Sequence, residues 1–422
     1  MYWNELTTGI YPWDIHDEGM ERILDNLQEH AGNNAAYLVS LVHHEKRPPY
    51  ELQYPHNPKR KIYIPEDSRA YFRVDPGLYG RIAPKETEQD FLKGTDWLDV
   101  FTKALRKRGM KTGAEISHTP LDAERAMRDY SDCLQKDVNG RPPMAPVFGM
   151  HIAQQLCWNS EDAVEYVCNL GRDLVRNYDI DVLQNCIIPF NPGRYDRHPI
   201  LGVFLGGCFC KNCEKKARAA GIDWDRLKAE AVHYNNVLTQ RSPELREEWL
   251  GIERSEASDS QLLLEHPLLY EWLRFRQNSY TEFIRKLSEA VHAERKSIDF
   301  RFNVCWKRAD LFGVNIKELA PHLDSVRVQD YSEQYGDESA IAEKGVWIAN
   351  IRRQIGEKPI IGGVAVRGKA SLKMIESGVT ENAKAAVDGL SYGFYDGATM
   401  ERLHVIRDTM KKLEITLRNG EE

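Results

Sequence analysis

The sequence lacks an excess of basic residues, a long apolar run and an N-terminal targeting segment. Its 57 Lys and Arg are outnumbered by 64 Asp and Glu, and no block of basic residues occurs, which argues against a general nucleic-acid or membrane-surface binder. It has no run of about 18 apolar residues, and its first residues, MYWNEL, do not form a charged region followed by an apolar one. We therefore expect a soluble cytoplasmic protein with no membrane or nucleic-acid partner. The sequence leaves homo-oligomerisation open.

Cysteine is also scarce, because 8 cysteines in 422 residues are too few for a disulfide scaffold. Four of them nevertheless suggest a ligand set. Cys208, Cys210 and Cys213 form a C-x-C-x-x-C motif, and Cys157 lies upstream in the segment CWNS. Four thiolates would complete a tetrahedral Zn²⁺ site with no open position, so we expect a structural zinc in a reducing compartment. The alternative is that these are buried cysteines without a metal.

A repeating pattern of short β-type runs and amphipathic helical segments extends through the chain. Such βα alternation predicts a parallel sheet, and eight units predict a closed (β/α)₈ TIM barrel. We expect one barrel domain over residues 1–422, with insertions after the second strand (about 46–95) and the fourth (about 191–266). The eight expected strands cover residues 8–13, 35–42, 111–117, 180–187, 298–305, 325–330, 359–366 and 387–394.

The cysteine motif, the segment 157–160 and the strand sequence VLQNC at 182–186 together resemble the zinc-bearing family 42 glycoside hydrolases, which are β-galactosidases. They also resemble bacterial hypothetical glycosyl hydrolases with a Cys-Phe-Cys-x-x-Cys barrel loop. The resemblance implies a barrel that hydrolyses glycosides with two glutamates, one after the asparagine that ends strand four and one ending strand seven.

This chain departs from that family at both catalytic positions. Cys186 stands where the family has its acid/base glutamate, and strand seven ends in the carboxylate-free sequence GVAVR at 363–367. Only Asn185 matches the family motif. A hydrolase with this sequence must therefore take its acids from other strands.

Chemistry in a TIM barrel takes place at the C-terminal ends of the strands, so acids at those ends are the candidates. We expect Asp330 to be the general acid, with Glu333 as its neighbour in the same loop. Glu115 on the third strand is the expected nucleophile or base, although it could instead be a counter-ion of Arg327. Glu45 is a further candidate.

Other polar and aromatic residues at the predicted strand ends could bind a substrate. In strands five and six the alternation turns Arg301, Asn303, Arg327 and Gln329 into the barrel, where a guanidinium needs partner carboxylates or an anionic ligand. Structural ion pairs are the alternative for both arginines, especially for Arg301. The expected substrate-binding residues are Trp13, Asp14, His43, His44, His118, Gln184, Asn185, Asn303, Trp306, Arg327, Arg367 and Tyr392.

The first insertion is rich in aromatic residues, which could stack on sugar rings or form a small core of their own. The leading hypothesis is a glycoside hydrolase whose substrate is a small or acidic glycoside, with Arg327 and Arg367 receiving a carboxylate or sulfate. One alternative is a sugar lyase or isomerase that uses a His/Glu site, and another is a glycan-binding barrel that has lost hydrolysis. Cys186 could also be a nucleophile if His198 or Arg194 activates it.

Overall fold

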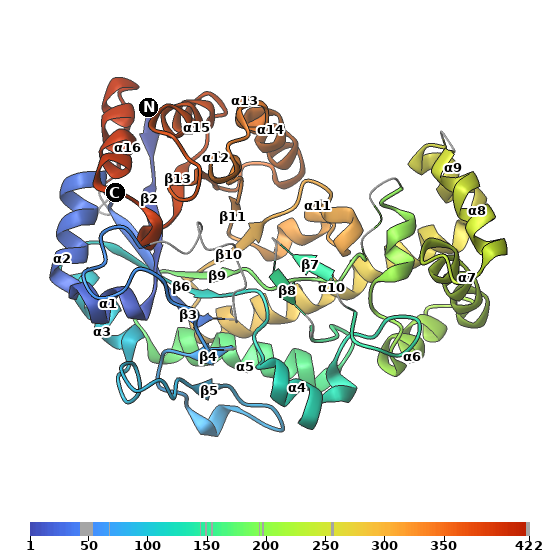
Figure 1. The fold of residues 1–422 in the computed structure, drawn as a ribbon. Coiled ribbons are helices and arrows are strands. Elements are labelled where there is room, and N and C mark those ends of the chain that lie inside the picture. Colours follow the sequence, from blue (N-terminus) through green and yellow to red (C-terminus); the bar gives the residue numbers. More distant parts are fainter. Residues whose placement is uncertain are drawn as a thin grey trace.

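The computed structural model describes residues 1–42, 54–66, 68–143, 145–147, 150–152, 155–193, 195, 198–254 and 257–418, with only the backbone for 145–147 and 150–152. Eight parallel strands form a closed ring, because each pairs with the next one along the chain and the last pairs with the first. The predicted (β/α)₈ barrel is confirmed (Figure 1). Its strands are β2 (Glu5–Ile10), β3 (Ala35–Val42), β6 (Lys111–Ile116), β9 (Val182–Asn185), β10 (Asp299–Val304), β11 (Ser325–Val328), β12 (Ile360–Gly363) and β13 (Gly389–Phe394).

One helix follows each strand and covers the outside of the ring (Figure 1). The helices bury their apolar faces against the outward-facing strand residues, as the predicted amphipathic pattern requires. Neighbouring helices also pack on one another: Gly171 of α5 lets α10 approach, because a Cβ at that position would lie 2.8 Å from Val291 and 2.9 Å from Leu287. The covering helices are α2 (Met20–Asp25), α3 (Trp97–Lys107), α5 (Glu161–Asn177), α10 (Pro267–Glu294), α11 (Ile316–Leu319), α14 (Lys344–Ile355), α15 (Leu372–Lys384) and α16 (Met400–Lys412).

The first strand lies earlier in the chain than we expected. We predicted it at 8–13, but β2 ends at Ile10 and the short helix α1 (Pro12–Glu18) follows. Proline is favoured in the first turn of a helix, and the Asp14 side chain accepts a hydrogen bond from the Tyr11 backbone N–H at 2.9 Å. These local signals outweigh the β-propensity of the aromatic residues around them.

The floor of the barrel is closed by an ion pair across its interior. Both Glu5 and Arg301 are 2% exposed or less, and Arg301 Nη2 donates to Glu5 Oε2 at 3.1 Å and also pairs with Asp299. Burial opposes the charge on Glu5, but Arg301 and Lys111 lower its pKa to about 2. Arg301 therefore has the structural role that the sequence left open.

The two insertions carry further helices and strands. In the first, Tyr54, Tyr71 and Phe72 are each 3% exposed or less, which favours the interpretation as a small core, whereas Tyr50 lies outside the described residues. The helices of the second project to one side of the barrel (Figure 1). The first insertion contains β4 (Arg69–Ala70) and β5 (Lys85–Glu86), and the second contains α6 (Lys211–Ala219), α7 (Trp224–Leu238), α8 (Pro243–Arg254) and α9 (Asp259–Glu265). Elsewhere, α4 (Ala123–Asp129), β7 (Ala145–Val147) and β8 (Met150–Ile152) lie between β6 and α5, and α12 (Ser332–Tyr335) and α13 (Glu338–Ala342) follow β11.

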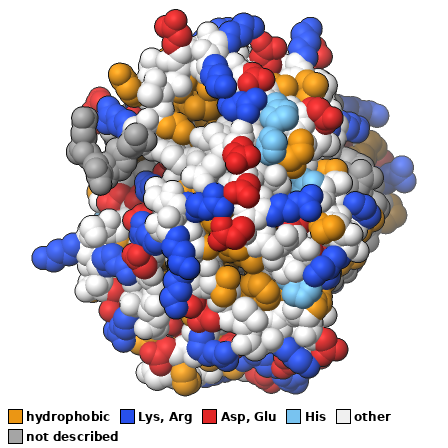
Figure 2. Space-filling model, turned by 90° about the vertical axis from the view of Figure 1, so that its left-hand side faces the viewer, with side chains coloured by type: hydrophobic (Ala, Val, Ile, Leu, Met, Phe, Trp, Pro, Cys, Tyr) orange, Lys and Arg blue, Asp and Glu red, His pale blue; other side chains and the backbone are white. Residues whose placement is uncertain are grey.

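The two chain ends lie side by side, because β1 (Tyr2–Trp3) pairs in parallel with β14 (Thr416–Leu417). On the face seen from that side, acidic and basic side chains are intermingled and hydrophobic ones show only in small groups (Figure 2). Exposed ion pairs of this kind contribute about 0–1 kcal/mol each, so the core and not the surface stabilises the barrel. Within the described residues, no helix combines the length and apolarity needed to cross a bilayer.

Candidate active site and metal centre

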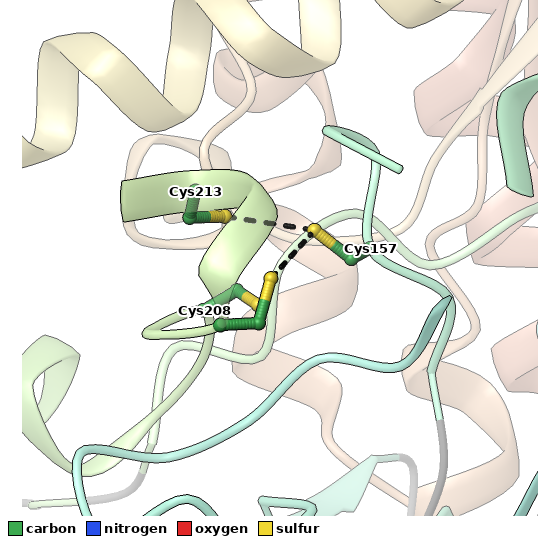
Figure 3. A group of neighbouring side chains, drawn as sticks. Cys157, Cys208 and Cys213 are labelled. Carbon is green, nitrogen blue, oxygen red and sulfur yellow. Dashed lines mark hydrogen bonds between the residues drawn. The ribbon is translucent and has the colours of Figure 1, made fainter. Parts of the chain in front are cut away.

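The four predicted metal ligands come together beside the barrel. Cys157 precedes α5, whereas Cys208, Cys210 and Cys213 surround the start of α6. The Cys157 Sγ lies 3.5 Å from the sulfurs of both Cys210 and Cys213, and all four sulfurs lie within 4.8 Å of one another. Figure 3 shows the labelled side chains turned toward one another. In a tetrahedral site with Zn–S bonds of about 2.3 Å the sulfurs are about 3.8 Å apart, so these thiols could bind a metal.

Hydrogen-bond donors surround the sulfurs, as thiolate ligands require. The Asn159 Nδ2 donates to Cys213 Sγ at 3.2 Å, and the Lys136 backbone N–H donates to Cys208 Sγ at 3.4 Å. Arg276 of α10 is fully buried nearby; burial lowers its pKa to about 9, while negative charge on Cys208 and Cys213 would raise it. Within the described residues, its Nε and Nη1 have no hydrogen-bond partner. A buried cation therefore lies where a four-thiolate metal site would have excess negative charge.

Four side chains from neighbouring strands meet inside the barrel, above the Glu5–Arg301 pair. Glu115 on β6 accepts a hydrogen bond from Gln184 on β9, and its Oε2 lies 3.3 Å from both Asn303 Nδ2 on β10 and Arg327 Nη1 on β11. All four are 2% exposed or less. The strand alternation places them on the inward face, as predicted for Asn303 and Arg327.

Glu115 has an unusual acidity for a carboxyl group. Burial, followed by the nearby charge of Cys186, raises its pKa to about 7, although Arg327 and the Gln184 hydrogen bond act in the opposite direction. A carboxyl group with this pKa can both donate and accept a proton near neutrality, which is the property of a general acid or base.

Arg327 is held by two tyrosines that the sequence did not suggest. Its guanidinium hydrogen-bonds to the Tyr331 hydroxyl and lies 5.0 Å from the centre of the Tyr37 ring. Tyr37 in turn donates to the backbone carbonyl of Gly393 at 3.1 Å. These contacts favour the alternative interpretation of Arg327, an ion pair with Glu115, over the expected role in binding a substrate.

Two thiols lie at the ends of the adjacent strands β9 and β10. The Sγ atoms of Cys186 and Cys305 are 3.8 Å apart, and Cys305 donates to Gln329 Oε1 at 2.8 Å. The contact with the Cys305 thiol lowers the pKa of Cys186 well below its usual value against the effect of burial, and His118 and Asn303 contribute in the same direction. Cys186 is thus set up to be a thiolate.

An apolar wall and a second guanidinium complete the barrel mouth. Trp306 stacks on Phe312 at 4.6 Å and packs in one cluster with Cys186 and Cys305. Arg367, beyond the end of β12, lies 4.9 Å from the centre of the Phe394 ring. Its Nε donates to Gln334 at 3.2 Å, whereas its buried Nη1 has no hydrogen-bond partner among the described residues.

Asp330 and Glu333 have a different environment from Glu115. Lys344, at the start of α14, lies 3.3 Å from Asp330 Oδ1 and 3.1 Å from Glu333 Oε1. Glu333 is fully buried, accepts a hydrogen bond from the Ala365 backbone at 3.0 Å and lies against Gly378 of α15. These contacts place both carboxylates in an ion pair between the strands and the helix layer, which favours a structural role.

The aromatic and acidic residues that follow β2 are also buried in contacts with the rest of the protein. Trp13 is 1% exposed and stacks on Tyr11 at 4.3 Å, and it also contacts Tyr63 and Tyr71 of the first insertion. Asp14 is fully buried; burial and the neighbouring Asp396 raise its pKa well above the usual value. Both residues therefore anchor α1 and the insertion.

Two further expected binding residues have structural partners. Tyr392 is fully buried and donates to Asn33 at 2.8 Å, at the N-terminal side of β3 and opposite to the mouth. The Asn185 Oδ1 accepts from the Ile187 backbone N–H at 2.9 Å and so shapes the turn that follows β9. His43, His44 and Glu45 lie outside the described residues.

The sequence predicted the residues at the centre of this site but not all of the residues that surround them. The structure brings Glu115, Gln184, Asn303 and Arg327 together, with His118 beside Cys186. The missed residues are Tyr37, Cys305 and Tyr331, whereas Gln329 is among the residues predicted to point into the barrel. Cys305 follows the predicted inward residue Asn303 by two positions, so the same alternation identifies it.

The comparisons with known proteins show the fold. No protein-family model and no curated protein sequence matches the chain. Among solved structures it is similar to the PgaB (BpsB) glycoside hydrolase domain from Bordetella bronchiseptica, with a TM-score of 0.59, 13% identity and coverage of 96% of this chain and 97% of that one.

Two other structures give similar results. A β-galactosidase from Rahnella sp. R3 aligns with a TM-score of 0.57 and 14% identity over 98% of this chain, which spans 56% of that protein. The catalytic domain of β-amylase from Paenibacillus polymyxa aligns with a TM-score of 0.54 and 11% identity, covering 98% of this chain and 99% of that one. At these identities the similarity supports the barrel architecture.

Proposed function

We propose that the protein is a carbohydrate-active enzyme that hydrolyses glycosidic bonds at the barrel mouth, with Glu115 as its proton donor. The observation that carries this proposal is a single carboxyl group with a pKa raised to about 7, held at the ends of the strands by three polar side chains. Glycoside hydrolysis requires such a protonated carboxyl group near neutral pH. The similarity to barrels named as glycoside hydrolase, β-galactosidase and β-amylase supports the same class.

The surrounding residues have distinct tasks in this proposal. Gln184 and Asn303 orient the carboxyl group by donating to it, and Arg327 stabilises the carboxylate that forms after the proton has left. Trp306 supplies an apolar surface for the face of a sugar ring. Hydrolysis is tested by incubating the purified protein with a panel of aryl glycosides and aryl uronides and measuring the released phenol.

The pH dependence of turnover follows from the raised pKa. Glu115 donates its proton only while it is protonated, so kcat/KM should fall as the pH rises above about 7. For an ordinary glutamate the same fall would begin near pH 4.3. The measurement is a pH profile of kcat/KM on the best phenyl glycoside of the panel, and a constant value between about pH 5 and 9 would contradict the assignment.

We also propose that the substrate is a small or acidic glycoside whose anionic group binds Arg367. The buried Nη1 of this guanidinium lacks a partner among the described residues, and a carboxylate or sulfate would satisfy it. Replacing Arg367 with Gln should raise KM for an aryl uronide by about 10- to 100-fold and change KM for the matching neutral glycoside much less. Arg353→Gln on the exposed face of α14 is the control. Equal effects on both substrates would contradict this proposal.

A metal is the second part of the proposal. We propose that one Zn²⁺ binds Cys157, Cys208, Cys210 and Cys213 and has a structural role. Four sulfur ligands leave no position for water or substrate, so the ion would join the start of α5 to the second insertion without taking part in the reaction. The N–H···S hydrogen bonds and the buried Arg276 support thiolate ligands at this place.

A sugar lyase or isomerase would need the same carboxyl group for another purpose. His118 is close enough to Glu115 to act on the pKa of its carboxyl group in the lowering direction, and such a pair could move a proton between carbon atoms of a sugar. The products distinguish the two reactions, because a hydrolase adds water across the glycosidic bond whereas an isomerase conserves the mass of its substrate.

A further inference from the structure

At the barrel mouth, the Cys186 thiol shares a hydrogen-bond donor, the Asn303 amide, with the Glu115 carboxyl group. The Asn303 amide donates to Glu115 Oε2 at 3.3 Å and is also hydrogen-bonded to Cys186. The register of β9 and β10 explains this, because Asn185 is opposite Phe302, and the next pair of residues along the strands is Cys186 and Asn303. One amide therefore connects the carboxyl group and the thiol.

The separation of the two groups suits a reaction at one sugar carbon. Glu115 is opposite Gln184 in the register, and Cys186 is two residues further along β9 on the same inward face. Two residues correspond to about 7 Å along a strand, and neighbouring strands are about 4.8 Å apart. Because side chains on one inward face converge, these positions can bring the two groups to the separation of about 5–5.5 Å that retaining glycosidases require.

The surroundings of Cys186 differ from those of the cysteines elsewhere in the core. Cys305, His118 and Asn303 all contact the Cys186 thiol and lower its pKa, although it is 3% exposed. Burial raises the pKa of Cys168 to about 11 and also raises that of Cys133. These two cysteines are therefore internal references for the reactivity of a buried thiol in this protein.

We propose that Cys186 is the nucleophile of the barrel mouth and acts together with Glu115. This inference rests on the proposed function. The Cys186 thiolate attacks the anomeric carbon, a C–S bond forms, and the glycosidic C–O bond breaks while the Glu115 carboxyl group protonates the leaving oxygen. Water then attacks the same carbon and gives its proton to the Glu115 carboxylate, and the C–S bond breaks with its electron pair returning to sulfur. No oxidant or reductant is needed.

His118 and Cys305 are positioning residues in this mechanism. The His118 imidazole hydrogen-bonds to the Cys186 thiol, and the Cys305 Sγ lies 3.8 Å from the Cys186 Sγ. The Gln329 carbonyl accepts from the Cys305 thiol at 2.8 Å and fixes its position. Neither residue forms a bond to the sugar.

The first test measures thiol reactivity and needs no substrate. The full chain is treated with limiting iodoacetamide at several pH values, and the modified peptides are quantified by mass spectrometry. We expect Cys186 to be alkylated at least about 10-fold faster than Cys168 at pH 6, because only the thiolate reacts. Alkylation of Cys186 at or below the rate of Cys168 would overturn the inference.

The second test separates this inference from the proposed function. Cys186→Ser should lower kcat on the order of 10³-fold or more, whereas the control variant Cys168→Ser, at a buried cysteine of α5 outside the barrel mouth, should keep the wild-type kcat. Wild type stopped during turnover should carry one glycosyl group on the peptide that contains Cys186. If Glu115→Gln abolishes turnover and Cys186→Ser does not, the inference fails while the proposed function stands. Circular dichroism of each variant confirms folding, and the alkylation result holds without any variant.

Discussion

Replacing Glu115 with Gln should lower kcat/KM for a phenyl glycoside by about 10²- to 10⁴-fold, the usual contribution of a general acid. Glutamine keeps the size of the side chain and can still accept from Gln184 and Asn303, so the barrel interior should stay packed. The proton is lost, and the leaving oxygen then departs with a full negative charge. Steady-state kinetics on the wild type and the variant measure the effect.

Asp330→Asn is the control for this prediction. Asp330 is a buried carboxylate at a strand end like Glu115, but Lys344 neutralises it and Ser332 hydrogen-bonds to it. We expect this variant to lose thermal stability and to keep kcat within about 10-fold of the wild type. The reverse pattern, with activity lost in Asp330→Asn and kept in Glu115→Gln, would contradict the assignment and identify Asp330 as the general acid, as expected from the sequence.

Removing the metal should have the second large effect. The protein purified under reducing conditions should contain one zinc per chain, and Cys213→Ser should lose it. Zinc in structural sites binds with about 10–16 kcal/mol of apparent free energy, which is folding free energy, so we expect a loss of several kcal/mol and a clearly lower Tm. Metal analysis by mass spectrometry and thermal unfolding followed by circular dichroism measure both effects.

The control for the metal is Cys168→Ser, which changes a buried cysteine of α5 outside the cluster. This variant should keep its zinc, and its Tm should fall only by the cost of a polar substitution in the core. Chelation of the wild type should reproduce the Cys213→Ser phenotype. A metal-free wild type with the same Tm as the metal-loaded protein would contradict a structural zinc.

The barrel could be predicted from the sequence because its signals are local and repeated. Alternation in strands five and six also placed Asn303 and Arg327 inside the barrel, and the spacing of Cys208, Cys210 and Cys213 indicated one ligand set. The first strand was misplaced because Pro12 begins a helix within a run of aromatic residues. In this case a local helix signal outweighed β-propensity.

The catalytic assignment could be predicted only in part, because it depends on contacts between distant segments. Nothing near Asp330 in the sequence shows that Lys344, one helix later, will pair with it and with Glu333. The raised pKa of Glu115 likewise needs the burial and the neighbouring charges that four separate strands create. Sequence pattern gives the inward direction of a side chain, but its ionisation depends on tertiary packing.

The most direct test of the central claim, that Glu115 protonates the leaving group at the barrel mouth, is the dependence of kcat/KM on the leaving group. A dinitrophenyl group needs no proton to depart, whereas an unsubstituted phenyl group does. We expect Glu115→Gln to hydrolyse the dinitrophenyl glycoside within about 10-fold of the wild-type rate and the phenyl glycoside about 10²- to 10⁴-fold more slowly. An equal loss on both substrates, or no loss on either, would contradict the claim.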